Sequence, residues 1–97
     1  MKPFFYFFVF SILFFGCSNP PKADFTYTPD NPKSGEEVHF INHSEDARTY
    51  SWNLGDMSIS DEENPVHIYQ DTGTYIVDLF AIKGLMSDEK TVTIYIK

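Results

Sequence analysis

The chain has 97 residues, of which 42% are hydrophobic, with a formal net charge of −7 and a single cysteine. This length allows one domain at most, and one cysteine excludes an intrachain disulfide. The acidic balance argues against nucleic acid as a partner, because phosphate binding needs a basic surface, and against electrostatic docking on anionic lipid.

The first 16 residues differ from the rest in composition. After a basic start, an apolar run extends from Phe4 to Phe15 and is interrupted only by Ser11. As a helix this run would span about 18 Å, which is shorter than a bilayer core of about 30 Å. A buried core helix is the alternative, but no amphipathic segment follows that would surround so uniformly apolar a stretch. We therefore expect residues 1–16 to be a cleaved signal peptide.

The apolar run closes with Gly16 and Cys17. A small residue followed by cysteine at this place resembles the lipobox of bacterial lipoproteins, although Phe14 stands where that motif prefers Leu. The resemblance implies a diacylglycerol on Cys17 and accounts for the unpaired thiol; a buried free cysteine and an intermolecular disulfide are the alternatives. We expect membrane contact through the acyl chains alone. Because Ser18 replaces the Asp of the retention signal known in some bacteria, we expect an outer-membrane location.

Residues 17–22 contain two prolines and favour an extended tether. From residue 23 onward apolar and polar residues alternate with a period of two, in segments of strand length separated by turn residues. The expected strands cover residues 23–28, 37–40, 49–54, 75–81 and 92–96. The aromatic side chains expected to face inward are Phe25, Tyr27, Phe40, Tyr50, Trp52, Tyr69 and Tyr75. The pattern predicts an all-β, antiparallel β-sandwich over residues 23–97.

Motifs within these strands resemble those of the polycystic-kidney-disease (PKD) domain, an immunoglobulin-like sandwich. The segment Y-S-W-N-L-G-D at 50–56 is similar to the family's Y-x-W-D-F-G-D-G, and N-P-V-H-I-Y at 64–69 and G-T-Y-I-V-D-L at 73–79 also resemble its motifs. Asn53, Leu54 and Met57 depart from the pattern. The resemblance covers residues 23–97 and implies a non-catalytic interaction module without a cofactor. Its structural signature residues here are Trp52, Gly55, Asp56, Pro65, His67, Tyr69, Gly73 and Tyr75.

Physical reasoning gives several of these residues structural roles. Trp52 lies mid-strand, where a sandwich needs a large ring between its sheets. Asp56 is placed to accept hydrogen bonds from turn amides. Tyr75 resembles the corner tyrosine of immunoglobulin-like sandwiches, whose hydroxyl bonds to nearby backbone.

Other chemistry finds little support in the sequence. No nucleophile elbow or phosphate-binding loop is present, so we expect no enzymatic activity. The three histidines lack the spacing of metal ligands. Asp56, Asp61 and Glu62 offer the oxygen ligands that calcium prefers, but without a periodic D-x-D-x-D-G loop; a solvated acidic loop is the alternative.

One feature favours a binding role. Ile76, Phe80 and Ile82 alternate with the inward-facing residues of one long strand, and Tyr95 does so on the last strand. On neighbouring strands these four side chains would form a single outward apolar patch, which is typical of a contact surface; cover by loops or by the tether is the alternative. We expect an envelope protein as the partner. The alternative is a glycan, held by Phe80 and Tyr95 near Asn53.

Overall fold

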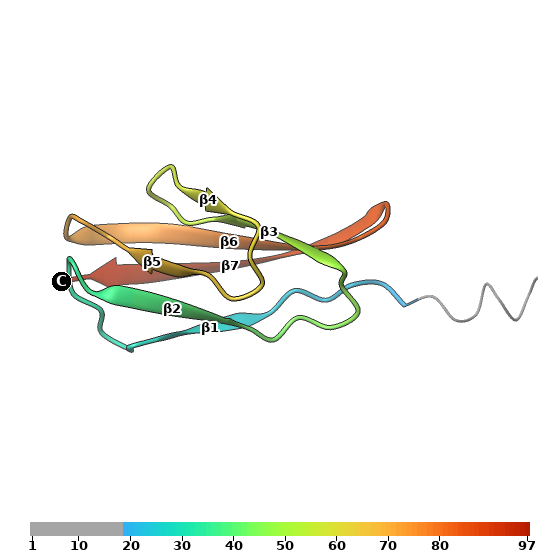
Figure 1. The fold of residues 1–97 in the computed structure, drawn as a ribbon, viewed down its shortest axis with the longest axis horizontal. Coiled ribbons are helices and arrows are strands. Elements are labelled where there is room, and N and C mark those ends of the chain that lie inside the picture. The colour runs from blue at the N-terminus through green and yellow to red at the C-terminus, as the bar shows by residue number, and fades with distance from the viewer. Residues whose placement is uncertain (1–18) are drawn as a thin grey trace, which may run out of the picture.

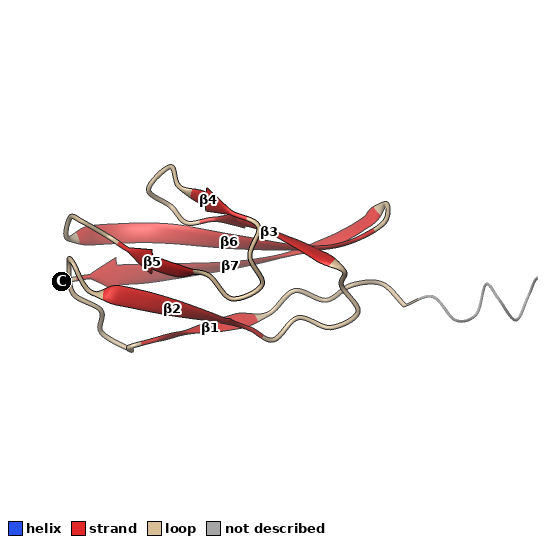
Figure 2. Cartoon of the chain, in the orientation of Figure 1, coloured by secondary structure: helices blue, strands red, loops and turns tan. Residues whose placement is uncertain are grey.

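The computed structural model describes residues 19–97, which form strands joined by turns (Figure 1). The strands in this range are β1 (Phe25–Thr28), β2 (Glu37–Asn42), β3 (Thr49–Asn53), β4 (Ile59–Ser60), β5 (Val66–Ile68), β6 (Gly73–Lys83) and β7 (Met86–Ile96). They pair into two antiparallel sheets, β1-β2-β5 and β4-β3-β6-β7, which form the two layers of a sandwich (Figure 2). The predicted all-β sandwich is confirmed. In residues 19–97 no helix is long and apolar enough to cross a bilayer, and the predicted signal peptide and Cys17 lie outside the described residues.

The core lies between the two sheets and is built by the alternation seen in the sequence. Phe25 and Phe40 from the three-stranded sheet meet Trp52 from the other sheet, with ring centroids 4.9 and 5.5 Å from that of Trp52. These three side chains are buried, as are Tyr69 and, on β6, every second residue from Val77 to Ala81. Of the aromatic residues predicted to face inward, Tyr27, Tyr50 and Tyr75 lie half-buried at the margin of the core.

The last two strands form a longer hairpin than the sequence pattern indicates. Alternation of apolar residues begins at Val92, but β7 begins at Met86 and pairs with β6 over its whole length, from Lys83↔Met86 to Gly73↔Ile96. Residues 87–91 are polar on both faces, so burial gives no signal there, and backbone hydrogen bonds to β6 hold this part of the strand. The short edge strands β4 and β5 were likewise absent from the predicted set.

Part of the predicted tether belongs to the folded domain. Pro21 is buried, and the backbone groups of Lys22 and Glu45 exchange two hydrogen bonds of 2.9 Å. The Lys83 ammonium group donates a hydrogen bond of 2.9 Å to the carbonyl of Asn19. The first described residues therefore run along the end of the sandwich that carries the β6–β7 turn, and the C-terminus lies at the opposite end (Figure 1).

Candidate functional site

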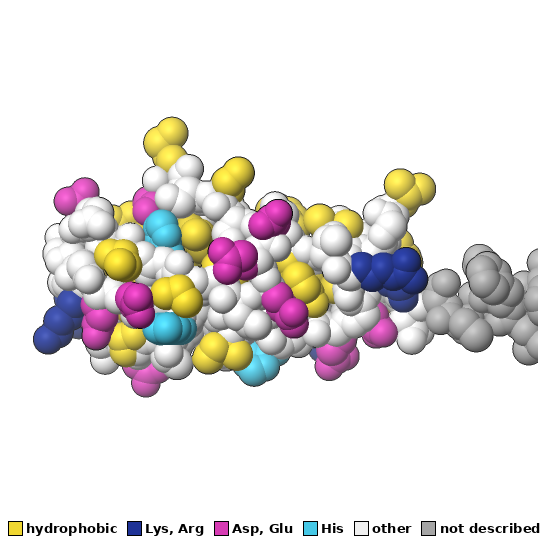
Figure 3. All heavy atoms as spheres, viewed as in Figure 1, with side chains coloured by type: hydrophobic (Ala, Val, Ile, Leu, Met, Phe, Trp, Pro, Cys, Tyr) yellow, Lys and Arg dark blue, Asp and Glu magenta, His cyan; other side chains and the backbone are white. Residues whose placement is uncertain are grey.

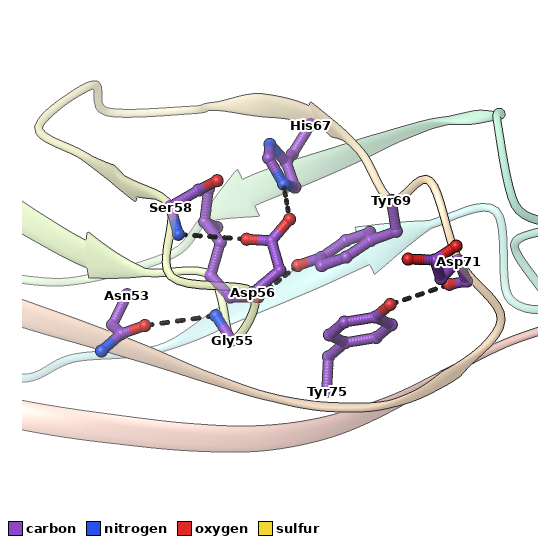
Figure 4. Close-up of polar contacts among 9 residues, drawn as sticks. Asn53, Gly55, Asp56, Ser58, His67, Tyr69, Asp71 and Tyr75 are labelled. Carbon is purple, nitrogen blue, oxygen red and sulfur yellow. Dashed lines mark hydrogen bonds and ion pairs between the residues drawn. The ribbon is translucent and has the colours of Figure 1, made fainter.

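A polar cluster ties the loop after β3 to β5 and the segment that follows it (Figure 4). One carboxylate oxygen of Asp56 accepts a hydrogen bond of 3.1 Å from the backbone N–H of Ser58. The other lies 2.7 Å from Nε2 of His67 on β5. The buried hydroxyl of Tyr69 donates a hydrogen bond of 2.7 Å to the carbonyl of Leu54. The expectation that Asp56 binds a turn amide is confirmed, and the cluster joins the two sheets at this loop.

The electrostatics of the cluster suit a structural role. Partial burial alone would raise the pKa of Asp56, but hydrogen bonds with His67 and Ser58 outweigh it and hold the pKa of this carboxyl below its usual 3.8. Burial raises the pKa of the Tyr69 hydroxyl, and the nearby Asp56 carboxylate and Tyr75 raise it further. Tyr69 therefore remains a hydrogen-bond donor, and Asp56 remains an ionised acceptor at neutral pH.

The backbone conformation of the same loop bears on two positions of the sequence motif, Gly55 and Met57. Gly55 has φ +92°, and a Cβ at this position would lie 2.7 Å from the carbonyl oxygen of Ile76. Both the conformation and the close approach require glycine. Met57 has φ +73°, where the family motif has glycine, so the chain tolerates a left-handed conformation at a side-chain-bearing residue.

The predicted corner bond is confirmed, since the Tyr75 hydroxyl donates to the carbonyl of Asp71 at 2.8 Å.

The outward apolar residues lie on one face of the four-stranded sheet, as predicted, but in two groups. Ile76 pairs with Thr93 and so lies diagonally beside Tyr95, and these two side chains are 56% and 60% exposed. Phe80 and Ile82 lie nearer the β6–β7 turn and are half-buried.

A polar row separates these groups. Asn53, Asp78 and Thr91 are paired across β3, β6 and β7 on the same face, and the Thr91 hydroxyl donates to the Asp78 carboxylate. The prediction of one continuous patch is therefore wrong, because Asp78 stands between Ile76 and Phe80 on their own strand.

The alternation pattern missed another apolar residue on this face. Ile59 on β4 pairs with Asn53 and is 80% exposed; a strand of two residues is too short to show a period. We call Ile59, Ile76 and Tyr95 the distal surface, since β6 begins and β7 ends at the end of the molecule away from the β6–β7 turn (Figure 1).

Comparison with known proteins identifies the fold. A family model described as the PKD domain matches residues 18–97. This chain belongs to the PKD-domain family. Collagenase ColA of Bacillus cereus is 35% identical over 98 residues, and the match covers 87% of this chain and 10% of the collagenase. The PKD domain therefore spans about a tenth of the length of that relative.

Solved structures agree with this assignment. The PKD1 domain of Vibrio anguillarum Epp superposes with a TM-score of 0.72 at 25% identity, over 82% of this chain and 96% of that one. A structure described as the basis for the promiscuous specificity of carbohydrate-binding modules from the β-sandwich superfamily superposes with a TM-score of 0.78 at 30% identity. That match covers 82% of this chain and 35% of the other chain.

The signature residues of this PKD domain occupy structural positions. Trp52, Pro65 and Tyr69 are buried. The loop roles of Gly55, Asp56, His67 and Tyr75 are given above, and Gly73 begins β6 with φ +150°. PKD domains are generally non-catalytic binding modules.

The weak calcium candidates Asp56, Asp61 and Glu62 are not brought together. Asp56 is already bound to His67 and Ser58, and within residues 19–97 no three His, Cys, Asp or Glu side chains are grouped to hold a metal ion.

Proposed function

We propose that this PKD domain is a non-catalytic binding module for a protein, displayed on the bacterial cell envelope through a lipid on Cys17. The distal surface carries the proposal. Ile76 and Tyr95 are diagonal neighbours on adjacent strands, each more than half exposed, and they contribute nothing to the core. An aromatic side chain beside a β-branched one on a flat sheet face is suited to be the centre of a protein interface.

A glycan is the second candidate, supported by the similarity to the carbohydrate-binding-module structure. The geometry favours it less. A sugar site usually presents flat exposed aromatic rings beside amides or carboxylates, but Trp52 is 1% exposed. Phe80 is half-buried beside the row of Asn53, whereas Tyr95 lies four residue pairs beyond that row on the other side. The two aromatic residues expected to share a sugar therefore do not lie together.

The lipid anchor rests on the sequence, where Gly16 and Cys17 end the apolar run, and the outer-membrane location rests on Ser18, which replaces the Asp of a retention signal. Metabolic labelling with a fatty-acid analogue should mark the wild-type protein and leave Cys17→Ser unlabelled. Equal labelling of both proteins would refute acylation of Cys17.

The binding proposal is tested with a pair of surface variants. The double variant Ile76→Ser, Tyr95→Ser should keep the wild-type melting temperature, because both side chains point away from the core, and should bind the protein partner at least about 30-fold more weakly, as expected on loss of an interface hot spot. Val66→Ser is the matched control, since Val66 is 49% exposed on the outer face of the other sheet. Retained protein binding by the double variant, or binding on a glycan array that the double variant loses, would refute the proposal.

A further inference from the structure

The turn of the β6–β7 hairpin presents an apolar side chain at the end of the sandwich. β3 pairs with β6 only as far as Thr49↔Ile82, so the last pair of the hairpin, Lys83↔Met86, and the turn beyond it extend past the neighbouring strand. Leu85 in this turn is fully exposed at 107%. A single exposed leucine is common on protein surfaces, and its meaning here depends on what lies around it.

The surroundings place this turn close to the proposed anchor. Lys83, next to the turn, bonds to the carbonyl of Asn19 at 2.9 Å, and Asn19 is two residues from Cys17 in the sequence. Two residues span at most about 7 Å of chain. Pro21 is buried, and Lys22 is paired with Glu45, so the chain leaves the domain from a fixed position beside the hairpin. A lipid on Cys17 would thus bring the bilayer surface within reach of Leu85.

The charge of this end differs from that of the rest of the domain. Lys22, Arg48 and Lys83 lie here: the backbone N–H of Arg48 bonds to the carbonyl of Ile82, which sets it beside the hairpin. The acidic residues of the same end are Glu45 and Asp46, in the loop before Arg48, and Asp88, whose carboxylate accepts a hydrogen bond of 2.8 Å from the backbone N–H of Ala23. Lys and Arg side chains gather next to the first described residues, and a hydrophobic side chain projects beside them (Figure 3).

At this end three cations, Lys22, Arg48 and Lys83, balance the three acidic residues, whereas the chain as a whole has 14 acidic side chains and 7 basic ones. The other surfaces of so acidic a domain would be repelled by anionic headgroups. The end with Leu85 is the one that approaches a bilayer without that repulsion, and long Lys and Arg side chains beside an apolar residue suit the headgroup region.

We propose that the β6–β7 turn, with Leu85 inserted between lipid headgroups and Lys83 and Arg48 beside it, is a second contact of this protein with the bilayer. The inference rests on the proposed anchor at Cys17. It modifies the expectation of contact through acyl chains alone. Two contacts orient the domain upright, so that the distal surface lies at the end of the domain far from the membrane.

The test uses tryptophan fluorescence on vesicles of phosphatidylethanolamine and phosphatidylglycerol with brominated acyl chains, which quench an indole only at short range. The lipidated full-length variant Leu85→Trp should be quenched relative to the same protein on unbrominated vesicles. Lipidated Ile59→Trp is the matched control, because Ile59 is 80% exposed on the four-stranded sheet, and it should show no more quenching than wild type, whose Trp52 is buried. Equal quenching of the two variants, or no quenching of either one, would overturn the inference.

A separate measurement tests whether Cys17 carries the proposed lipid. Mass spectrometry of the purified wild-type protein reports acyl groups on Cys17, and their absence would refute the proposed function. Because the chain has a single cysteine, the mature chain from Cys17 onward can then be coupled to a maleimide phospholipid in the same vesicles. Quenching of Leu85→Trp in that coupled protein supports the hairpin contact, and its absence overturns it. As a second variant, Leu85→Ser should speed transfer of the lipidated protein between vesicles about tenfold, as expected from loss of one leucine buried in lipid, whereas Val66→Ser should leave the rate unchanged.

Discussion

Truncation of Trp52 should remove most of the stability of this domain. The indole is 1% exposed, lies against Phe25 and Phe40, and donates a hydrogen bond of 2.8 Å to the carbonyl of Glu62. Replacement of a buried Trp by Ala costs about 3–5 kcal/mol, and the lost hydrogen bond costs about 1 kcal/mol. A domain of this length has roughly 4–12 kcal/mol in total, so Trp52→Ala should be close to unfolded at 37 °C.

The matched control is Trp52→Phe, which keeps one ring in the core and loses the hydrogen bond, at a cost of about 1–2 kcal/mol. Urea unfolding is followed by far-UV circular dichroism, which does not depend on the indole. With an m value of about 1 kcal/mol/M, Trp52→Phe should lower the midpoint by about 1–2 M, and Trp52→Ala should lower it by about 4 M. An Ala midpoint within 1 M of wild type would refute the central position of this ring.

Three further changes test the loop cluster by urea unfolding. Asp56→Asn should lower the free energy of unfolding by about 1.5–3 kcal/mol at pH 7. Because the folded pKa of Asp56 lies below 3.8, this loss of stability should be present above pH 3.8 and disappear as the pH falls through the folded pKa. A loss of stability that does not change with pH would contradict the bond to His67. Gly55→Ala should destabilise by about 2 kcal/mol or more, since it combines an unfavourable φ with a contact on the Ile76 carbonyl, and a neutral effect would exclude the close approach. Tyr75→Phe should cost only about 0.5–1.5 kcal/mol, and a loss of folding would show that the ring position depends on the hydroxyl.

The sequence predicted the sandwich and its core well because burial imposes a period of two on strands with one inward face. Trp52, Phe25 and Phe40 follow this period and are buried together. Asp56 was also assigned the correct kind of partner, since short polar side chains in turns bond to nearby backbone amides, and Tyr75 was assigned its backbone partner from the resemblance to a corner tyrosine.

Two of the strand segments that the pattern missed have a common physical origin, because burial does not set the pattern there. The strand at Ile59 is too short for periodicity, and the polar first half of β7 is held by its ladder with β6. The continuous patch failed for another reason. Alternation assigns a residue to a face, but it gives no position across strands, and only the register shows that Asp78 divides the apolar residues.

Site-specific photocrosslinking in intact cells tests the central claim most directly. p-Benzoylphenylalanine replaces Tyr95, an aromatic residue that is 60% exposed on the distal surface, and in a second protein it replaces His39, which is exposed on the outer face of the other sheet. A protein that binds the distal surface should give a discrete crosslinked product from position 95, which disappears when Ile76→Ser is added, and none from position 39. A discrete product from position 39 with none from position 95 would contradict the account, as would a product from position 95 that Ile76→Ser leaves unchanged.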